Sequence, residues 1–204
     1  AQDSTAQRVI PKPSPTFELD VLVNGRPVAE YFARGRTYIE AIQGAEYELR
    51  VRNPSADRVA VALSVDGLNT IDARHTSAWN ASKWVIEPYQ TITISGWQMS
   101  SERARRFYFT NERDSYGAKL GQTANLGNIS PVFFRERRRE VTIVRPQEAP
   151  ASKSRRAEGT MDSRAAAPMR DDDEYAATGI GRNVRNDVRW VNMDLDSNAA
   201  GEVT

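Results

Sequence analysis

Two consecutive strand patterns between residues 46 and 67 constrain the fold of this chain more than any other stretch. Residues 46–52 (EYELRVR) alternate charged and apolar side chains strictly, so every second side chain is expected to face a core. Residues 58–65 (RVAVALSV) are more apolar, which indicates a central strand. Asn53-Pro54 separates the two runs and Asp66-Gly67 supplies turn chemistry at the end. Because two strands with apolar faces require an opposing layer, we predict an all-β protein.

Further short strand patterns recur between residues 17 and 147. Asn24-Gly25 predicts a hairpin, with residues 26–32 as the return strand, and Pro27 confines that strand to an edge. Residues 72–82 and 111–125 look like loops, the second with one helical turn, and residues 140–144 look like the last strand of the body. The spacing of about ten residues between strands predicts an antiparallel β-sandwich over residues 17–147, Ig-like or jelly-roll-like.

Both ends of the chain differ in composition from this body. Residues 1–16 carry prolines at alternate positions and predict an extended, Pro-rich arm. Residues 148–204 form a long tail that we expect to be mostly irregular, because its polar composition buries little apolar area. Residues 178–181 (TGIG) are interpreted as a flexible bend. Residues 187–196 alternate again and predict a docking strand, which needs an edge of this body or of another chain.

Composition excludes several classes of protein. The chain has no cysteine, which removes disulfides, thiolate catalysis and cysteine metal sites. No window of 18 apolar residues occurs, so we expect no transmembrane segment of its own. The small, polar residues that follow Ala1 favour a mature end left by signal-peptide cleavage, with a trimmed recombinant start as the alternative. We therefore expect an exported protein, periplasmic or extracellular.

Four local patterns resemble those of exported bacterial β-sandwich proteins of unassigned function. They are residues 65–69 (VDGLN), 84–89 (WVIEPY), 106–110 (RFYFT) with 115–117 (SYG) downstream, and 178–181 (TGIG). The resemblance implies export from a bacterial cell and a β-sandwich body. It implies no activity, ligand or catalytic residue.

The residues that carry catalytic chemistry are sparse. His75 is the single histidine, and its spacing from Ser77 and Asp72 matches no recognised hydrolase arrangement. The acidic block at residues 171–174 is typical of a solvated charge run rather than a calcium loop. A dinucleotide site at residues 178–181 lacks both the third glycine and a preceding strand. We expect no enzyme activity, no cofactor and no bound metal.

Two arginine clusters and two tryptophans are the candidate partner-binding residues. Arginine binds anionic groups well, and exposed tryptophan anchors interfaces. For Trp79, a core position and an interface position are equally expected. Nucleic acid is not expected as a partner, because alternating aromatic residues on a strand usually fill a core. The candidates are Trp79, Arg103, Arg105, Arg106, Arg135, Arg137, Arg138, Arg139 and Trp190.

These observations favour a non-catalytic accessory subunit of the bacterial envelope. It would dock on a larger, membrane-associated assembly through its sandwich surface and extended termini, with other protein subunits as partners and anionic lipid headgroups as a further candidate. The alternative is a carbohydrate-binding or adhesive module that uses Trp79 and the long loops. Whether the tail docks on its own body or on another chain is left open.

Overall fold

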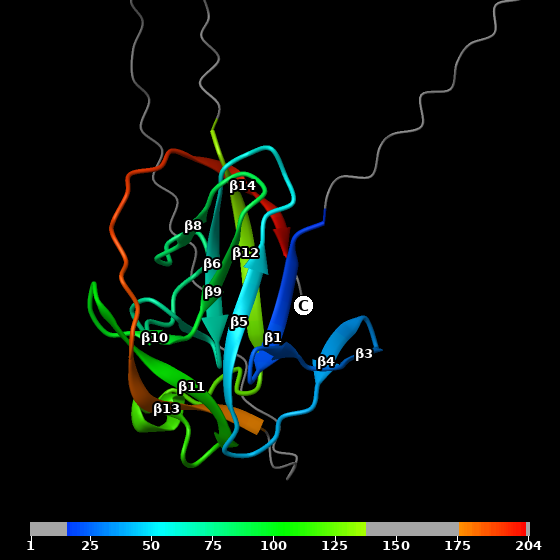
Figure 1. The fold of residues 1–204 in the computed structure, drawn as a ribbon, viewed down its shortest axis with the longest axis vertical. Helices are drawn as coiled ribbons and strands as arrows, with labels where there is room; N and C mark the ends of the chain where they lie inside the picture. Colours follow the sequence, from blue (N-terminus) through cyan, green and yellow to red (C-terminus); the bar gives the residue numbers. More distant parts are fainter. Residues whose placement is uncertain (1–15, 138–175, 203–204) are drawn as a thin grey trace, which may run out of the picture. The chain divides into compact units, whose positions relative to one another are not determined.

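The computed structural model describes residues 16–137 and 176–202, and these residues belong to one compact unit. Every strand pairing is antiparallel, which confirms the all-β prediction (Figure 1). The elements are β1 (Glu18–Val23), β2 (Arg26–Pro27), β3 (Glu30–Ala33), β4 (Arg36–Ile39), β5 (Glu46–Arg52), β6 (Val59–Val65), β7 (Leu68–Asn69), β8 (Trp84–Ile86), β9 (Thr91–Ile94), β10 (Gly96–Gln98), β11 (Arg103–Asn111), α1 (Tyr116–Lys119), β12 (Ile129–Glu136), β13 (Ala176–Arg185) and β14 (Leu195–Glu202).

The first sheet is built around β5. Strand β1 pairs along one edge of β5, and β2 continues beyond β1 through the Asn24-Gly25 turn. The other edge of β5 pairs with β11 at Glu46 and Tyr47 and with β9 along residues 49–52. Strands β5 and β11 therefore separate after Tyr47, and we call this place the fork of the first sheet. The chain bends at Ser95 inside that fork, and β10 then runs along β11. Gly96 is required there, because a Cβ would lie 1.9 Å from the carbonyl oxygen of Arg105.

The second sheet is built around β6, as its apolar sequence predicted. Strand β12 pairs with the full length of β6 on one side, while β8 and β7 share the other side. Strand β14 extends the sheet beyond β12. Asp66 and Gly67 both have positive φ in the turn between β6 and β7, which is the backbone of a type I′ turn.

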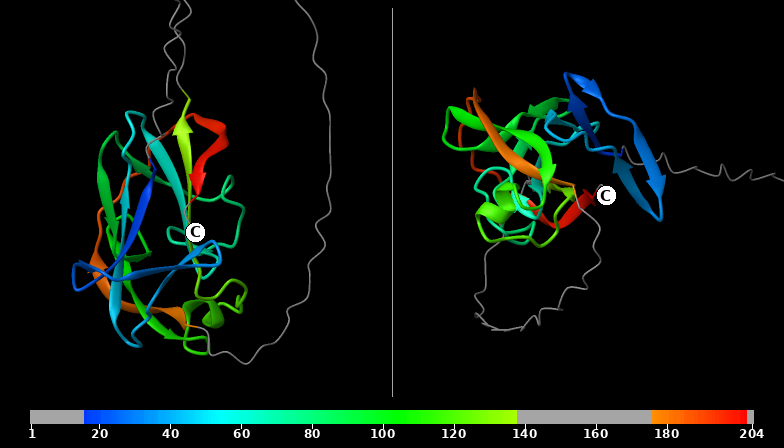
Figure 2. Two further views of the ribbon diagram at one scale, coloured as in Figure 1. Left: turned by 90° about the vertical axis from the view of Figure 1, so that its right-hand side faces the viewer. Right: turned by 90° about the horizontal axis from the view of Figure 1, so that it is seen from below.

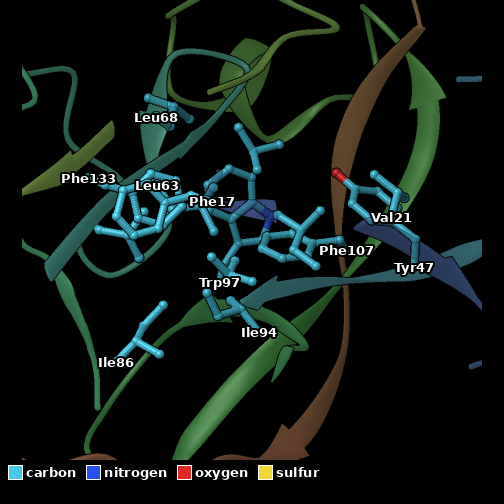
Figure 3. Close-up of a cluster of buried hydrophobic side chains, with 14 of the residues drawn as sticks. Phe17, Val21, Tyr47, Leu63, Leu68, Ile86, Ile94, Trp97, Phe107 and Phe133 are labelled. Carbon is cyan, nitrogen blue, oxygen red and sulfur yellow. The ribbon is translucent and has the colours of Figure 1, made fainter. Parts of the chain in front are cut away.

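The two sheets share one hydrophobic core (Figure 3). Tyr47, Leu49 and Val51 of β5 are buried, and the charged residues between them face outward, so the alternation of residues 46–52 is confirmed. Phe17 stacks on Phe133 of the second sheet with ring centroids 4.2 Å apart. Trp97 is 1% exposed and packs edge-on against Phe107 of β11, with ring centroids 5.2 Å apart. Burying a large aromatic or aliphatic side chain contributes roughly 1.5–3 kcal/mol, so this shared core is the main source of stability.

Strands β3 and β4 form a separate two-stranded sheet, which we call the flap (residues 30–39). Figure 2 shows the two blue strands standing apart from the rest of the sheets. The prediction of one return strand over residues 26–32 is wrong, because β2 ends at Pro27 and, after one more backbone hydrogen bond from Val28 to Val21, the chain leaves β1 and forms β3. The chain then turns back at Arg34-Gly35, where both residues have positive φ.

The C-terminal segment joins both sheets. Strand β13 pairs with β11 in the first sheet and β14 pairs with β12 in the second. Between them runs the crossover segment (residues 186–194), seen in orange and red along one side in Figure 1. The docking strand predicted at residues 187–196 is therefore wrong in its bounds. Val188 still donates to the carbonyl of Ser101 near the end of β13, the middle of the segment crosses between the sheets, and β14 begins only at Leu195.

Residues 178–181 are not the flexible bend that the sequence suggested. They lie inside β13. A Cβ on Gly179 would lie 2.1 Å from the ring of Tyr108, so glycine lets β13 pass directly under that ring. The indole Nε1 of Trp97 donates to the carbonyl of Gly179 at 3.1 Å. This glycine pattern therefore serves close packing of β13 onto the first sheet.

Several predictions fall outside the described residues. The Pro-rich arm predicted at residues 1–16 lies outside them except for Thr16, as do the strand predicted at residues 140–144 and the part of the tail from 148 to 175. The predicted loops at residues 72–82 and 111–125 do lie within the described part, and the second loop contains the single helical turn α1.

Candidate functional site

The flap exposes three aromatic side chains. Tyr31 and Tyr38 are directly opposite each other in the β3–β4 ladder and are 58% and 47% exposed. Phe32 is 79% exposed, and Arg34 and Arg36 next to the turn are also exposed. A two-stranded hairpin is marginally stable in water, and exposed aromatic residues beside arginine are typical of interface centres.

A cavity of about 220 Å³ lies between the base of the flap and the two sheets, and we call it the flap pocket. Arg36, Tyr38 and Ile39 line it from the flap. Tyr47 and Phe109 line it from the first sheet. The pocket is therefore an apolar, aromatic space lined by the flap on one side and by the first sheet on another.

Asp66 is the buried charge of the flap pocket. Its side chain is 2% exposed and lies at the β6–β7 turn. The backbone N–H of Gly127 donates to Oδ1 at 2.7 Å, and the N–H of Thr178 donates to Oδ2 at 2.6 Å. Burial raises the pKa of Asp66 from 3.8 to about 6, because removal from water penalises the ionised form more than the hydrogen bonds from Gly127 and Thr178 favour it.

Tyr47 and Thr178 complete the polar wall of the flap pocket. Their hydroxyl oxygens are 2.7 Å apart and share a hydrogen bond. Burial raises the pKa of Tyr47 above its ordinary value, so its hydroxyl stays protonated at neutral pH. The pocket thus joins β5, the β6–β7 turn and β13, segments that are distant in sequence.

A second hollow, which we call the crossover groove, lies beside β8 and β9. It has a volume of about 620 Å³ and is lined by these strands and by the crossover segment. Within the described residues, β8 pairs only with β6 and β9 pairs only with β5, so the second edge of each strand is not paired with another strand. Trp190 lines this groove and is 80% exposed. The groove is a second candidate for binding.

The predicted contact residue Trp79 has a mixed environment. It is 47% exposed, and its ring packs edge-on against Phe134 with centroids 5.5 Å apart. The Lys83 ammonium lies 5.8 Å from the Trp79 ring centroid and 5.1 Å from that of Phe134. Trp79 therefore packs on Phe134 of the second sheet and also presents surface to solvent. Its environment is intermediate between the core position and the interface position that the sequence left open.

The predicted arginine contacts mostly have partners inside the protein. Arg106 forms a short ion pair with Glu48 at the fork of the first sheet. Arg105 donates to the carbonyl of Gly181 at 2.8 Å. Arg135 lies 3.7 Å from Asp57. These arginines hold strands together, and their contact with a partner protein stays a prediction.

The remaining predicted residues differ in their settings. Arg137 is exposed and donates to the carbonyl of Leu195 at 3.3 Å, next to β14. Arg103 is exposed on β11. Arg138 and Arg139 lie outside the described residues. Among the described residues, no pocket is lined by an arginine of these clusters together with Trp79 or Trp190.

The outer face of the first sheet is a ladder of ion pairs. Asp20 and Glu18 of β1 lie opposite Arg50 and Arg52 of β5, at 3.0 and 3.3 Å. Glu46 pairs with Arg182 of β13 at 2.9 Å. Because such exposed pairs contribute about 0–1 kcal/mol each, their main effect is to give this face a charged, self-compensated surface.

Sequence reasoning did not single out Tyr31, Phe32 or Tyr38. The sequence feature that could have indicated a hairpin is the strand-like pattern on both sides of Arg34-Gly35. This pair lacks the Asn or Asp that usually precedes glycine in such a turn. Asp66 was predicted only as part of the Asp66-Gly67 turn. Its burial depends on Thr178, which is 112 residues away, and no local pattern carries that information.

The described residues contain neither a metal-binding cluster nor a helix that could span a membrane. Within residues 16–137 and 176–202, no three His, Asp or Glu side chains gather as a metal site. The one described helix is too short and too polar to cross a membrane. No family model, curated protein or solved structure matches this chain. Fold and geometry together define an antiparallel all-β protein with two candidate binding hollows.

Proposed function

We propose that the protein is a non-catalytic accessory subunit of a bacterial envelope assembly, periplasmic or at the cell surface, with a β-sandwich body. It binds another protein subunit of that assembly through the flap. The export part of this proposal derives from the sequence. The binding part is supported by the flap itself, the observation that carries the proposal.

The flap has the composition and setting of a docking element. Its three aromatic side chains are exposed at one small hairpin that forms its own sheet. Full burial of one aromatic side chain contributes roughly 1.5–3 kcal/mol, so docking of the flap supplies several kcal/mol. The ion-paired outer face of the first sheet lacks such apolar surface, which favours the flap over that face.

The role of the termini changes with the structure. The described C-terminal strands pair with their own body, so the tail contributes to docking through the exposed side chains of the crossover segment rather than through a free strand. Trp190 is the foremost of these side chains. Anionic lipid headgroups remain a proposed secondary partner for the exposed Arg103 and Arg137.

Site-specific crosslinking tests this proposal. A photoreactive amino acid in place of Phe32, in the native host, should give one defined crosslinked product with another protein. The matched control is the same replacement at Arg52, an exposed position on the ion-paired face. No product from position 32, or equal products from both positions, would contradict docking through the flap.

Carbohydrate binding is the second candidate, and the crossover groove favours it. Trp190 offers an exposed indole face, on which a sugar ring stacks, beside a groove that also holds Asp187 and Arg189. A glycan array with the intact protein, Trp190→Ala and Trp79→Ala tests it. A ligand that is lost with Trp190→Ala and kept with Trp79→Ala supports this candidate, and the absence of any glycan ligand refutes it.

A further inference from the structure

We propose that the flap pocket receives the guanidinium or ammonium group of a basic side chain from the partner protein, with the Asp66 carboxylate as its counter-charge. This inference rests on the proposed function, because it assumes a protein partner at the flap. It adds the chemistry by which that partner is recognised: an arginine or lysine that enters beneath the exposed aromatic residues.

The size of the flap pocket suits a single side chain. Pockets that enclose whole drug-sized ligands usually have volumes of about 300–1,000 Å³. The flap pocket measures about 220 Å³, which is below that range. Its aliphatic lining, which includes Leu19, Val21 and Ile39, matches the methylene stem of a lysine or arginine.

The charge of the pocket is uncompensated. Among the ion pairs of the described residues, none includes Asp66, although its side chain is 2% exposed. The backbone N–H groups of Gly127 and Thr178 and the Thr178 hydroxyl occupy three of the roughly four acceptor sites of the carboxylate, which leaves a further site for a partner. A buried carboxylate without a cation is costly, and a cation placed beside it lowers that cost. The raised pKa of Asp66 agrees with this reading.

The other polar and aromatic groups of the pocket also favour a cation. Tyr38, Tyr47 and Phe109 present aromatic rings to the space, and cations interact favourably with such rings. Glu30 adds a second carboxylate at the flap. Arg36 is the one cationic residue that lines the pocket, and it is exposed.

Arg36 supplies the competing explanation. Its guanidinium belongs to this chain and could turn inward to occupy the pocket itself. The variant Arg36→Ala separates the two possibilities. If Arg36 were the natural occupant, its removal would raise the pKa of Asp66. If a partner side chain is the occupant, Arg36→Ala leaves the free protein unchanged and does not weaken binding of an added cation.

The experiment is a titration of the full-length protein by carbon-detected NMR of the Asp66 carboxyl group. The probes are N-acetyl-arginine N-methylamide, the corresponding lysine derivative, and the citrulline derivative as a neutral control of matched shape. We expect a saturable shift with the arginine or lysine probe and none with citrulline. Affinity should rise from about pH 4 to about pH 7, tenfold for each unit by which binding lowers the pKa of Asp66.

Asp66→Asn provides the second arm of the test. Because this variant has no carboxyl group at position 66, its readout is the backbone amide resonances of Gly127 and Thr178, which contact that side chain. These amides should respond to the cationic probes in the wild type and not in Asp66→Asn, while the resonances of Trp97 report that the core is intact. If that variant does not fold, the citrulline control and the pH dependence in the intact protein decide the question. A response to citrulline equal to that of arginine, affinity that does not change with pH, or no saturable shift would overturn the inference. Crosslinking at Phe32 tests the proposed function separately, so the two failures are distinguishable.

Discussion

Stability against pH gives a direct test of the burial of Asp66. Its folded-state pKa of about 6 lies above its value of 3.8 outside the fold, so the folded protein binds more protons than the unfolded chain between these values. The contribution of Asp66 to stability is therefore fully present below about pH 4 and is lost as the pH rises through about 6. Stability should fall over this interval, opposite to the usual effect of carboxylates in ion pairs.

The magnitude follows from the size of the pKa shift. A shift of about two units corresponds to a loss of at most about 3 kcal/mol, at about 1.4 kcal/mol for each unit. Asp66→Asn cannot titrate, and its single carbonyl oxygen can accept from only one of the Gly127 and Thr178 N–H groups. The variant should therefore be less stable than the wild type at about pH 4, by roughly 1–3 kcal/mol for the unpaired donor.

Urea unfolding of both proteins from about pH 4 to about pH 7 measures this effect. Other carboxylates titrate in both proteins, so the difference between wild type and Asp66→Asn isolates Asp66. We expect the advantage of the wild type to shrink by up to about 3 kcal/mol across this range. A difference that stays constant, or that grows with pH, would show that Asp66 is not a buried charge of the kind described.

Three further predictions concern the framework. Gly96→Ala should destabilise the protein by more than about 2 kcal/mol in urea unfolding, because its Cβ would meet the carbonyl of Arg105 at 1.9 Å. Glu48→Ala should cost roughly 1–3 kcal/mol in the same assay, because it leaves the half-buried Arg106 without its ion-pair partner. Deletion of residues 176–204 should prevent folding, as judged by loss of the cooperative transition, because β13 and β14 complete both sheets.

The two substitutions each have a matched comparison. Gly181→Ala places a Cβ 3.0 Å from the carbonyl of Arg106, so its effect should be clearly smaller than that of Gly96→Ala. Glu18→Ala removes an exposed pair with Arg52 and should change stability by less than about 1 kcal/mol. Equal effects within either pair, or a stable protein without residues 176–204, would contradict the described packing.

The sequence predicted the parts of this fold that follow from local patterns. The alternation in residues 46–52 and the apolar run in 58–65 gave two strands with correct faces, because burial on one side of a strand imposes a period of two. Asn24-Gly25 and Asp66-Gly67 gave two turns, because few residues tolerate positive φ in succession. Arg34 and Gly35 also have positive φ in succession, but Arg34 stands where such turns usually have Asn or Asp, so the sequence did not mark the flap turn.

The features that sequence could not supply depend on distant partners. Residues 187–196 alternate like a strand, yet whether they join a ladder depends on where β13 and β14 end. Arg105 and Arg106 resemble a binding cluster, and only the fork of the first sheet reveals their partners at Gly181 and Glu48. Local sequence reports the period of an element, while the pairing of its side chains is set by the whole fold.

The central claim is that the flap is the surface by which this protein binds its partner subunit. Hydrogen exchange of the protein, alone and within its native assembly, tests this claim most directly. We predict that amides of residues 30–39 exchange several-fold more slowly in the assembly, while those of β1 and β5 on the ion-paired face keep their rates. Unchanged exchange in the flap, with slower exchange elsewhere on the surface, would contradict the claim.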